Sequence, residues 1–317
     1  MKQRKRWLSF AAAPFALAFL AFAQPAHAAN YTGDCASIPN HVTGNATVTD
    51  ANCVINTGST LLVDGNITIS GSDGVEVKSD IVAQGLVSIS ATTGQIKTKK
   101  ITSSLNDVIL KSVQNRVETK AITAGNSVQI DAGQLAGQGS TWDVKVTGPI
   151  VINTVQTNPN PAFHGNVLIR AAGPVNTETI RTDGDLGQSS IKSGGIQIDT
   201  YTKGANSTEF VIGGTASANG VNGNLITHSS IGGGTQAASI IGGINITNGG
   251  SAATGGIRVV DMGAIKVRAT QSRSGWIQLN AGSGTLFLPT GKLNADGESG
   301  TSPQGAGSIY LLSLIHI

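Results

Sequence analysis

Charged side chains that recur at one spacing are the features of this sequence that could do chemistry. The first group is Glu178, Arg181, Asp183, Asp185, Lys192 and Asp199. Glu178 and Asp199 are 21 residues apart, so a structure that repeats with this period would stack their carboxylates. Stacked carboxylates beside an arginine would suit a calcium site that supports β-elimination from a uronic acid polymer. The alternative is a polar turn, with Asp183-Gly184-Asp185 as loop residues.

The second group is a set of lysines, Lys78, Lys99 and Lys120, which are also 21 residues apart. Stacking would align them in one column of like charge. One interpretation is a solvated, charged face that discourages lateral association of sheets. The other is a docking strip for an anionic polymer such as an acidic glycan. Two residues before each lysine, a second column alternates in sign and should pair across strands: Glu76, Lys97 and Glu118.

The two cysteines, Cys35 and Cys53, are predicted to form a disulfide, because the chain begins with a secretory leader. They have no nearby pair of histidines, so they make a poor zinc site. The four histidines outside the leader are scattered without metal-ligand spacing: His41, His164, His228 and His316. The sequence contains no nucleophile elbow, phosphate loop or calcium-binding repeat. We therefore predict no metal site and no cofactor.

A repeat of about 20 residues must position all of these side chains. Short strand patterns begin at Ile67, Val87, Val108 and Val128, with spacings of 20, 21 and 20 residues. A second pattern between them begins at Val75, Ile96 and Val117. Each unit thus contains two strands in which apolar residues alternate with polar ones, joined by Gly, Ser, Thr and Asn. A unit of this size cannot close a core alone and must stack on its neighbours, which is typical of a solenoid.

The composition of the units favours one type of solenoid. Val, Ile and Thr at alternate positions, with Gly or Asn at corners, predict an all-β fold, a parallel β-helix with about 20–21 residues per coil. The general rule for crossover connections predicts a right-handed coil. At this period the mature chain would form roughly 14 coils. The alternative is an antiparallel sandwich with regular strand spacing.

The N-terminal segment 1–28 has the features of a secretory signal peptide. Basic residues at the start precede an apolar run from Leu8 to Phe22, and Ala26-His27-Ala28 fits a cleavage site. The run is too short for a membrane anchor. Four of the 21 Lys and Arg residues lie in this leader, so 17 remain in the mature chain against 18 Asp and Glu. This balance gives no support for nucleic-acid binding.

The mature chain is predicted to be one elongated domain. Residues 29–59 should form an N-terminal cap closed by the disulfide, and residues 60–311 the β-helix. The glycine-rich stretch 204–256 should lie within the helix, because Ile244, Ile265 and Leu286 are again spaced by 21 residues, as are Val175 and Ile196. Residues 312–317 should form an irregular tail of a truncated chain.

The strand Gly-Asn-x-Thr/Val-Ile, seen at 65–69, the turn unit Gly-x-Ile/Val-x-Thr-x-x-Ile and the secretory leader resemble the filamentous-haemagglutinin-like and autotransporter-passenger β-helix proteins of bacteria. The resemblance lies in the residue pattern and the repeat period, and it covers most of 45–311. It implies a secreted or cell-surface rod used in adhesion or as a scaffold. Two-partner-secreted members carry Asn-Pro-Asn motifs near the start of the mature chain, whereas the single copy here is at 158–160.

We therefore predict a non-catalytic structural or adhesive protein of the bacterial surface, docking an anionic glycan or a surface receptor through Lys78, Lys99 and Lys120. One alternative is a polysaccharide lyase or hydrolase on the same scaffold, which would need a deep groove lined by convergent charges. Another is an ice-binding solenoid. That function would need Thr-x-Thr ladders on a flat face, whereas Thr98 and Thr119 are flanked by charges.

Overall fold

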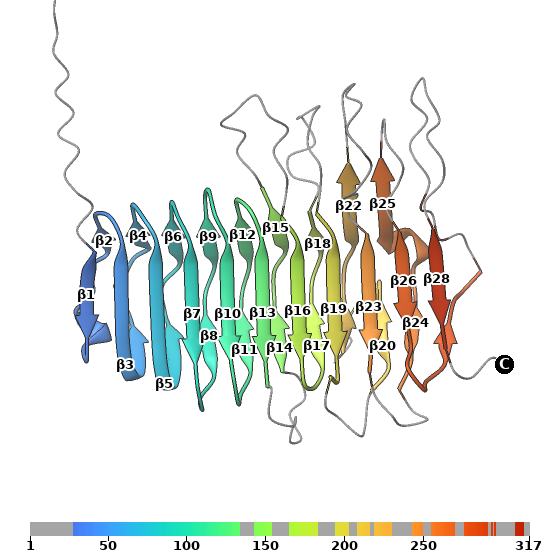
Figure 1. Cartoon of the computed structure of the whole chain (residues 1–317), viewed down its shortest axis with the longest axis horizontal. Coiled ribbons are helices and arrows are strands. Elements are labelled where there is room, and N and C mark those ends of the chain that lie inside the picture. Colours follow the sequence, from blue (N-terminus) through green and yellow to red (C-terminus); the bar gives the residue numbers. More distant parts are fainter. Residues whose placement is uncertain are drawn as a thin grey trace, which may run out of the picture.

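The structure is a computed structural model. It describes residues 28–133, 143–153, 165–182, 194–202, 208–215, 219–229, 243–249, 255–269, 276–290, 293, 295 and 308–313. These residues form one stack of short strands, and every pairing between them is parallel (Figure 1). The predicted parallel β-helix is confirmed. The predicted leader, except for Ala28, lies outside the described residues.

The β-helix has three faces. The first face carries the longest run of strands, in the order β1 (Ala29–Thr32), β3 (Ala46–Ile55), β5 (Ile67–Val77), β7 (Val87–Ala91), β10 (Val108–Ser112), β13 (Val128–Ala132), β16 (Val167–Ala171), β19 (Ile196–Thr200), β23 (Ile244–Asn248), β26 (Ile277–Asn280) and β28 (Ile309–Leu312). Each strand pairs in register with the next one, so the described chain contains eleven rungs on this face.

The second face begins with the C-terminal ends of β3 and β5, which continue around a corner from the first face. It continues with β8 (Ile96–Thr98), β11 (Val117–Thr119), β14 (Val144–Val146), β17 (Val175–Thr177), β21 (Gly220–Val221), β20 (Phe210–Ile212), β24 (Ile257–Val259) and β27 (Leu286–Phe287). One coil supplies both β20 and β21. The second face therefore gains a rung that the first face lacks.

The third face is a separate sheet of short strands: β2 (His41–Val42), β4 (Leu61–Val63), β6 (Ile81–Ala83), β9 (Ile101–Ser103), β12 (Ile122–Ala124), β15 (Ile150–Ile152), β18 (Ile180–Arg181), β22 (Leu225–Ser229) and β25 (Ile265–Ala269). Two 3-10 helices, η1 (Cys35–Ser37) and η2 (Met262–Ala264), lie in the connections.

The core is a column of Val, Ile and Leu side chains inside the coil. Ile67, Val87, Val108 and Val128 are register partners, and each is at most 1% exposed. The predicted buried column is confirmed. It continues to Val167, Ile196, Ile244 and Ile277, which lie in the longer coils. Buried and outward positions alternate along the strands, and the outward positions carry most of the polar residues.

Asparagine and aspartate side chains brace the corner that leads into the first face. The Oδ1 of Asn45 accepts the backbone N–H of Asn66 at 2.8 Å, and the Oδ1 of Asn66 accepts that of Leu86 at 2.7 Å. The bonds from Ser127 to Asp107 and from Gly195 to Asn166 repeat this geometry. A Cβ at Gly85 would collide with the Asn66 side chain, so a larger residue there would displace the acceptor of the Leu86 N–H.

The first coil contains the predicted disulfide. Cys35 in η1 and Cys53 in β3 have Cα atoms 5.3 Å apart and are bonded, and both are buried. The ladder starts earlier than the predicted boundary at residue 60, because β1 already pairs with β3. The disulfide-closed segment is therefore the first part of the β-helix itself.

A constant spacing fails as a guide to register in the second half. Ile244, Ile265 and Leu286 lie on the first, third and second faces respectively, and Val175 and Ile196 also lie on different faces. These predicted columns are wrong. Every step along the sequence between first-face partners beyond Val128 is longer than the step from Val108 to Val128; the later partners are Val167, Ile196, Ile244, Ile277 and Ile309. Longer coils also explain why the described chain has eleven rungs instead of the expected fourteen or so.

Candidate ligand-binding groove

The three lysines of the predicted docking strip follow the last residues of three stacked strands. Val77, Thr98 and Thr119 end β5, β8 and β11 on the second face, and Lys78, Lys99 and Lys120 come next. The backbone N–H of Lys120 donates to the carbonyl of Lys99. The lysines therefore stand on successive rungs, at the corner between the second and third faces. We call Lys78, Lys99 and Lys120 the lysine row.

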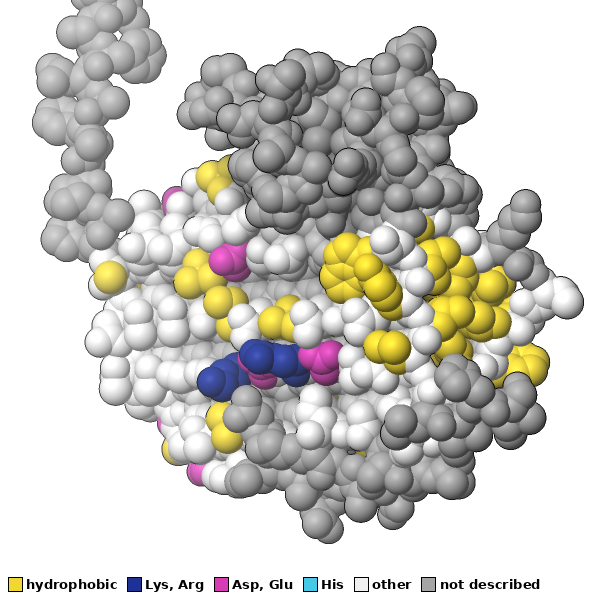
Figure 2. Space-filling view, turned by 45° about the vertical axis from the view of Figure 1, so that its right-hand side comes forward, with side chains coloured by type: hydrophobic (Ala, Val, Ile, Leu, Met, Phe, Trp, Pro, Cys, Tyr) yellow, Lys and Arg dark blue, Asp and Glu magenta, His cyan; other side chains and the backbone are white. Residues whose placement is uncertain are grey.

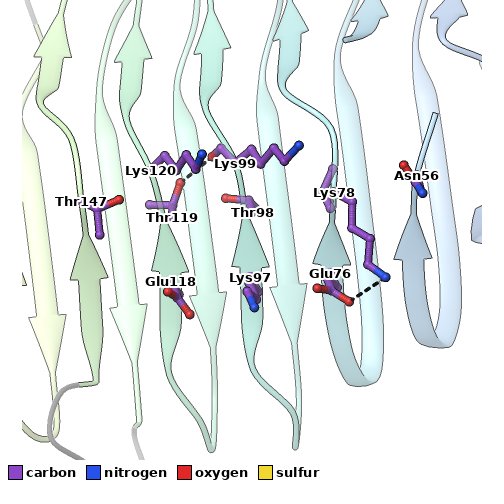
Figure 3. Close-up of a pocket in the computed structure, with 11 residues that line it drawn as sticks. Asn56, Glu76, Lys78, Lys97, Thr98, Lys99, Glu118, Thr119, Lys120 and Thr147 are labelled. Atoms are coloured by element: carbon purple, nitrogen blue, oxygen red, sulfur yellow. Dashed lines mark hydrogen bonds and ion pairs between the residues drawn. The ribbon is translucent and has the colours of Figure 1, made fainter. Parts of the chain in front are cut away.

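The lysine row lines an open groove of about 480 Å³. Figure 3 shows the long side chains of Lys99 and Lys120 lying along the row, while Lys78 bends toward Glu76. Thr98 and Thr119 lie below the lysines, and the ladder of Glu76, Lys97 and Glu118 forms the opposite wall. The groove is therefore one strip of ammonium groups beside one strip of mixed charge.

Two of the three ammonium groups are available to a ligand. The Nζ of Lys78 lies 3.5 Å from the Oε2 of Glu76, and both side chains are well exposed to solvent. Such a surface pair contributes at most about 1 kcal/mol. In the part of the chain that the structure describes, no carboxylate lies within 4.0 Å of the Nζ of Lys99 or Lys120. An anionic ligand would find the least competition at these two lysines.

The alternating ladder is longer than the sequence spacing predicted. Glu76, Lys97 and Glu118 are register partners, as expected, and Lys145 follows Glu118 on the next rung. The step along the sequence from Glu118 to Lys145 is longer than the step from Lys97 to Glu118, so a search at constant spacing misses it. The pattern Val144-Lys145-Val146 matches the other second-face strands, and it could have identified Lys145 as the next rung of the ladder. Opposite charges on neighbouring strands stabilise the second face.

The predicted stacking of Glu178 and Asp199 is wrong. Glu178 follows Thr177 at the end of β17 on the second face, one rung beyond Val146. Asp199 lies in β19 on the first face, where its register partners are Arg170 and Thr247. The two residues belong to consecutive coils, but the coil from Arg170 to Asp199 is longer than the regular repeat. One regular repeat after Glu178 therefore leads to Asp199 on the first face and not to the next rung of the second face.

The other members of that acidic group are not brought together by the described structure. Arg181 lies in β18 on the third face. Asp183, Asp185 and Lys192 lie outside the described residues. Glu178, Arg181 and Asp199 are thus placed on three different faces of the β-helix.

Asp199 instead ends a row of alternating charges on the first face. The row is Lys111, Asp131, Arg170 and Asp199, each the register partner of the next. Arg170 donates two hydrogen bonds to the buried carboxylate of Asp131, at 2.7 Å and 3.1 Å. This pairing raises the pKa of Arg170. Figure 2 shows a short row of Lys or Arg and Asp or Glu side chains near the middle of the face in view.

Further properties of the described residues bear on function. They contain no group of three or more His, Cys, Asp or Glu side chains arranged to hold a metal ion. No helix among them is long and apolar enough to cross a membrane. Comparison of the chain with protein-family models, with curated protein sequences and with solved structures finds no match.

Proposed function

We propose that this chain is a secreted or cell-surface structural β-helix, non-catalytic, that adheres to an anionic polymer such as an acidic glycan through the lysine row. The observation that carries the proposal is the placement of Lys78, Lys99 and Lys120 on successive rungs of one groove. The secretory leader and the resemblance to bacterial surface β-helix proteins support the location.

The spacing of the lysine row fits a linear polyanion better than a single small anion. Neighbouring rungs are about 4.8 Å apart, so the backbone positions of Lys78 and Lys120 are separated by about 10 Å. A chain of sugars with regularly placed carboxylates or sulfates could meet all three ammonium groups along one line. Its negative charge would also relieve the repulsion among the lysines.

Binding of this kind should weaken with salt. The lysines are exposed, and charges at a surface are screened beyond a Debye length of about 8 Å at physiological ionic strength. The polysaccharide lyase alternative depended on stacked carboxylates at Glu178 and Asp199. Because these residues lie on different faces, we do not propose it.

The test is retention on immobilised heparin, with elution by a salt gradient. The variant Lys99→Gln with Lys120→Gln removes the two lysines that have no carboxylate neighbour among the described residues. Its matched control, Lys111→Gln with Lys266→Gln, removes the same charge from the first and third faces. We expect the first variant to elute at clearly lower salt than wild type, and the control to elute close to wild type. Thermal denaturation should show that both remain folded.

Equal retention of the two variants would contradict the proposal and leave the lysine row as a solvated face. A parallel assay should follow unsaturated products from polyuronates with and without calcium. Product release that is abolished by Asp199→Ala would replace the adhesive function with a lyase.

A further inference from the structure

A second surface with regular chemistry lies on the first face, at the N-terminal end of the stack. At the start of each of the strands β1, β3, β5 and β7, two alternate side chains point outward. All eight are small, polar and uncharged: Asn30, Thr32, Thr47, Thr49, Thr68, Ser70, Ser88 and Ser90. We call these residues the hydroxyl array. The proposed adhesive function does not use it.

The array is a two-dimensional lattice because its two rows are both in register. Asn30, Thr47, Thr68 and Ser88 are partners along one row, and Thr32, Thr49, Ser70 and Ser90 along the other. The rungs are about 4.8 Å apart, and two residues along a strand span about 6.6 Å. Figure 1 shows β1, β3, β5 and β7 side by side and nearly parallel.

Most of the hydroxyls face solvent instead of the protein. One pair bonds across strands, the Oγ atoms of Thr49 and Ser70 at 3.1 Å. Within the described part of the chain, the hydroxyls of Thr47, Thr68, Ser88 and Ser90 have no protein hydrogen-bond partner. Thr47 and Thr68, near the centre, are exposed. Their β-branched side chains have few rotamers, which holds the hydroxyls in place.

The array ends where its chemistry changes. On the next rung β10 presents Ile109 and Lys111, and the row of alternating charges follows. No member of the array is charged or aromatic. A surface without charge offers nothing to a polyanion, and one without aromatic rings lacks the stacking platforms on which sugar rings usually rest.

We propose that the hydroxyl array binds ice. Its regular spacings are of the same order as the distances between oxygen atoms on the faces of hexagonal ice, so hydroxyls held by the ladder can replace water molecules of the crystal. Hydrogen bonds that ordered water makes to protein groups are nearly as favourable as direct ones. A ladder shared by four strands fixes the hydroxyls before binding, which lowers the ordering cost of contact with a crystal.

The sequence argued against ice binding because Thr98 and Thr119 are flanked by charges, but these two threonines do not belong to the exposed array. Thr98 and Thr119 are buried and point into the coil, so their charged neighbours do not bear on an ice-binding surface. The repeated pattern is instead Thr47-Val48-Thr49, Thr68-Ile69-Ser70 and Ser88-Ile89-Ser90, in which the middle residue is buried. The nearly constant step between these triplets places them on one face.

The test is partition of the mature chain into slowly growing polycrystalline ice, together with thermal hysteresis. Thr68→Tyr places a large side chain in the middle of the array, in a strand position that tolerates aromatic residues. Its matched control is Thr123→Tyr, which makes the same change at an outward position of β12 on the third face. We expect wild type and Thr123→Tyr to be enriched in the ice fraction, and Thr68→Tyr to fall to the level of an excluded carrier protein.

Exclusion of the wild type from ice would overturn the proposal, and so would equal enrichment of wild type and Thr68→Tyr. A third arm uses microcrystalline cellulose and chitin as solid probes. Binding to them that is lost in Thr68→Tyr, with no enrichment in ice, would assign the array to a polysaccharide surface. These outcomes are independent of heparin retention, because the array and the lysine row lie on different faces.

Discussion

The N-terminal and C-terminal halves of the β-helix use the same ladder with different lengths of chain. From Ala46 to Val128 the first-face partners of successive coils keep a nearly constant spacing along the sequence, whereas beyond Val128 every step is longer and the steps differ from one another. Yet Val108 and Ile246 are equally buried in the two halves. Extra residues therefore leave the core unchanged when they enter between strands. In this β-helix the stacking of strands in space is constant, whereas the number of residues per coil varies.

The largest expected effect tests whether both halves share one core. Val108→Asp places a charge among buried apolar side chains and should cost on the order of 4 kcal/mol or more of the free energy of unfolding. Ile246→Asp should cost about as much, because its side chain is also fully buried. Denaturant unfolding measures both. A much smaller cost for Ile246→Asp would show that the irregular half is packed less well than the regular half.

The next effect concerns a feature of the N-terminal half. The disulfide between Cys35 and Cys53 closes a step of 18 residues in the first coils. Replacing both cysteines by serine should lower the free energy of unfolding by about 3 kcal/mol in the chain-entropy model. Mature protein, denatured without a reductant, should contain no titratable thiol. Two thiols per chain would contradict the bond.

The smallest effect compares the corner hydrogen bonds of the two halves. Asn66→Ala removes the acceptor of the Leu86 N–H in a coil of regular length, and Asn166→Ala removes that of the Gly195 N–H in a longer coil. Each bond is 2.7 Å long, so each variant should cost about 1 kcal/mol. Thermal denaturation of the two variants measures the difference. An effect at Asn66 alone would mean that the longer coil braces its corner by other contacts.

The candidate site could be predicted from the sequence where coils have equal length. Lys78, Lys99 and Lys120 lie on three consecutive coils of constant length, so their spacing placed them on one row. Lys145 belongs to the same surface, but its coil is longer, and the constant spacing missed it. Glu178 and Asp199 had the expected spacing by coincidence and lie on different faces. Equal spacing is evidence for stacking only while the chain between strands stays constant.

The sequence by itself determined the class of fold, the buried column through Val108 and the pairing of its two cysteines. The first two features depend on local patterns: alternating apolar residues select strands, and glycine with asparagine selects corners. Only the tertiary structure decided which coils align beyond Gly133 and that the hydroxyl array faces outward as one surface. It also decided that Asp199 lies opposite Arg170 on the neighbouring strand of the first face. The reason is physical. Register in a parallel stack is set by hydrogen bonds and core contacts between coils, and an insertion between strands changes the sequence distance without changing those contacts.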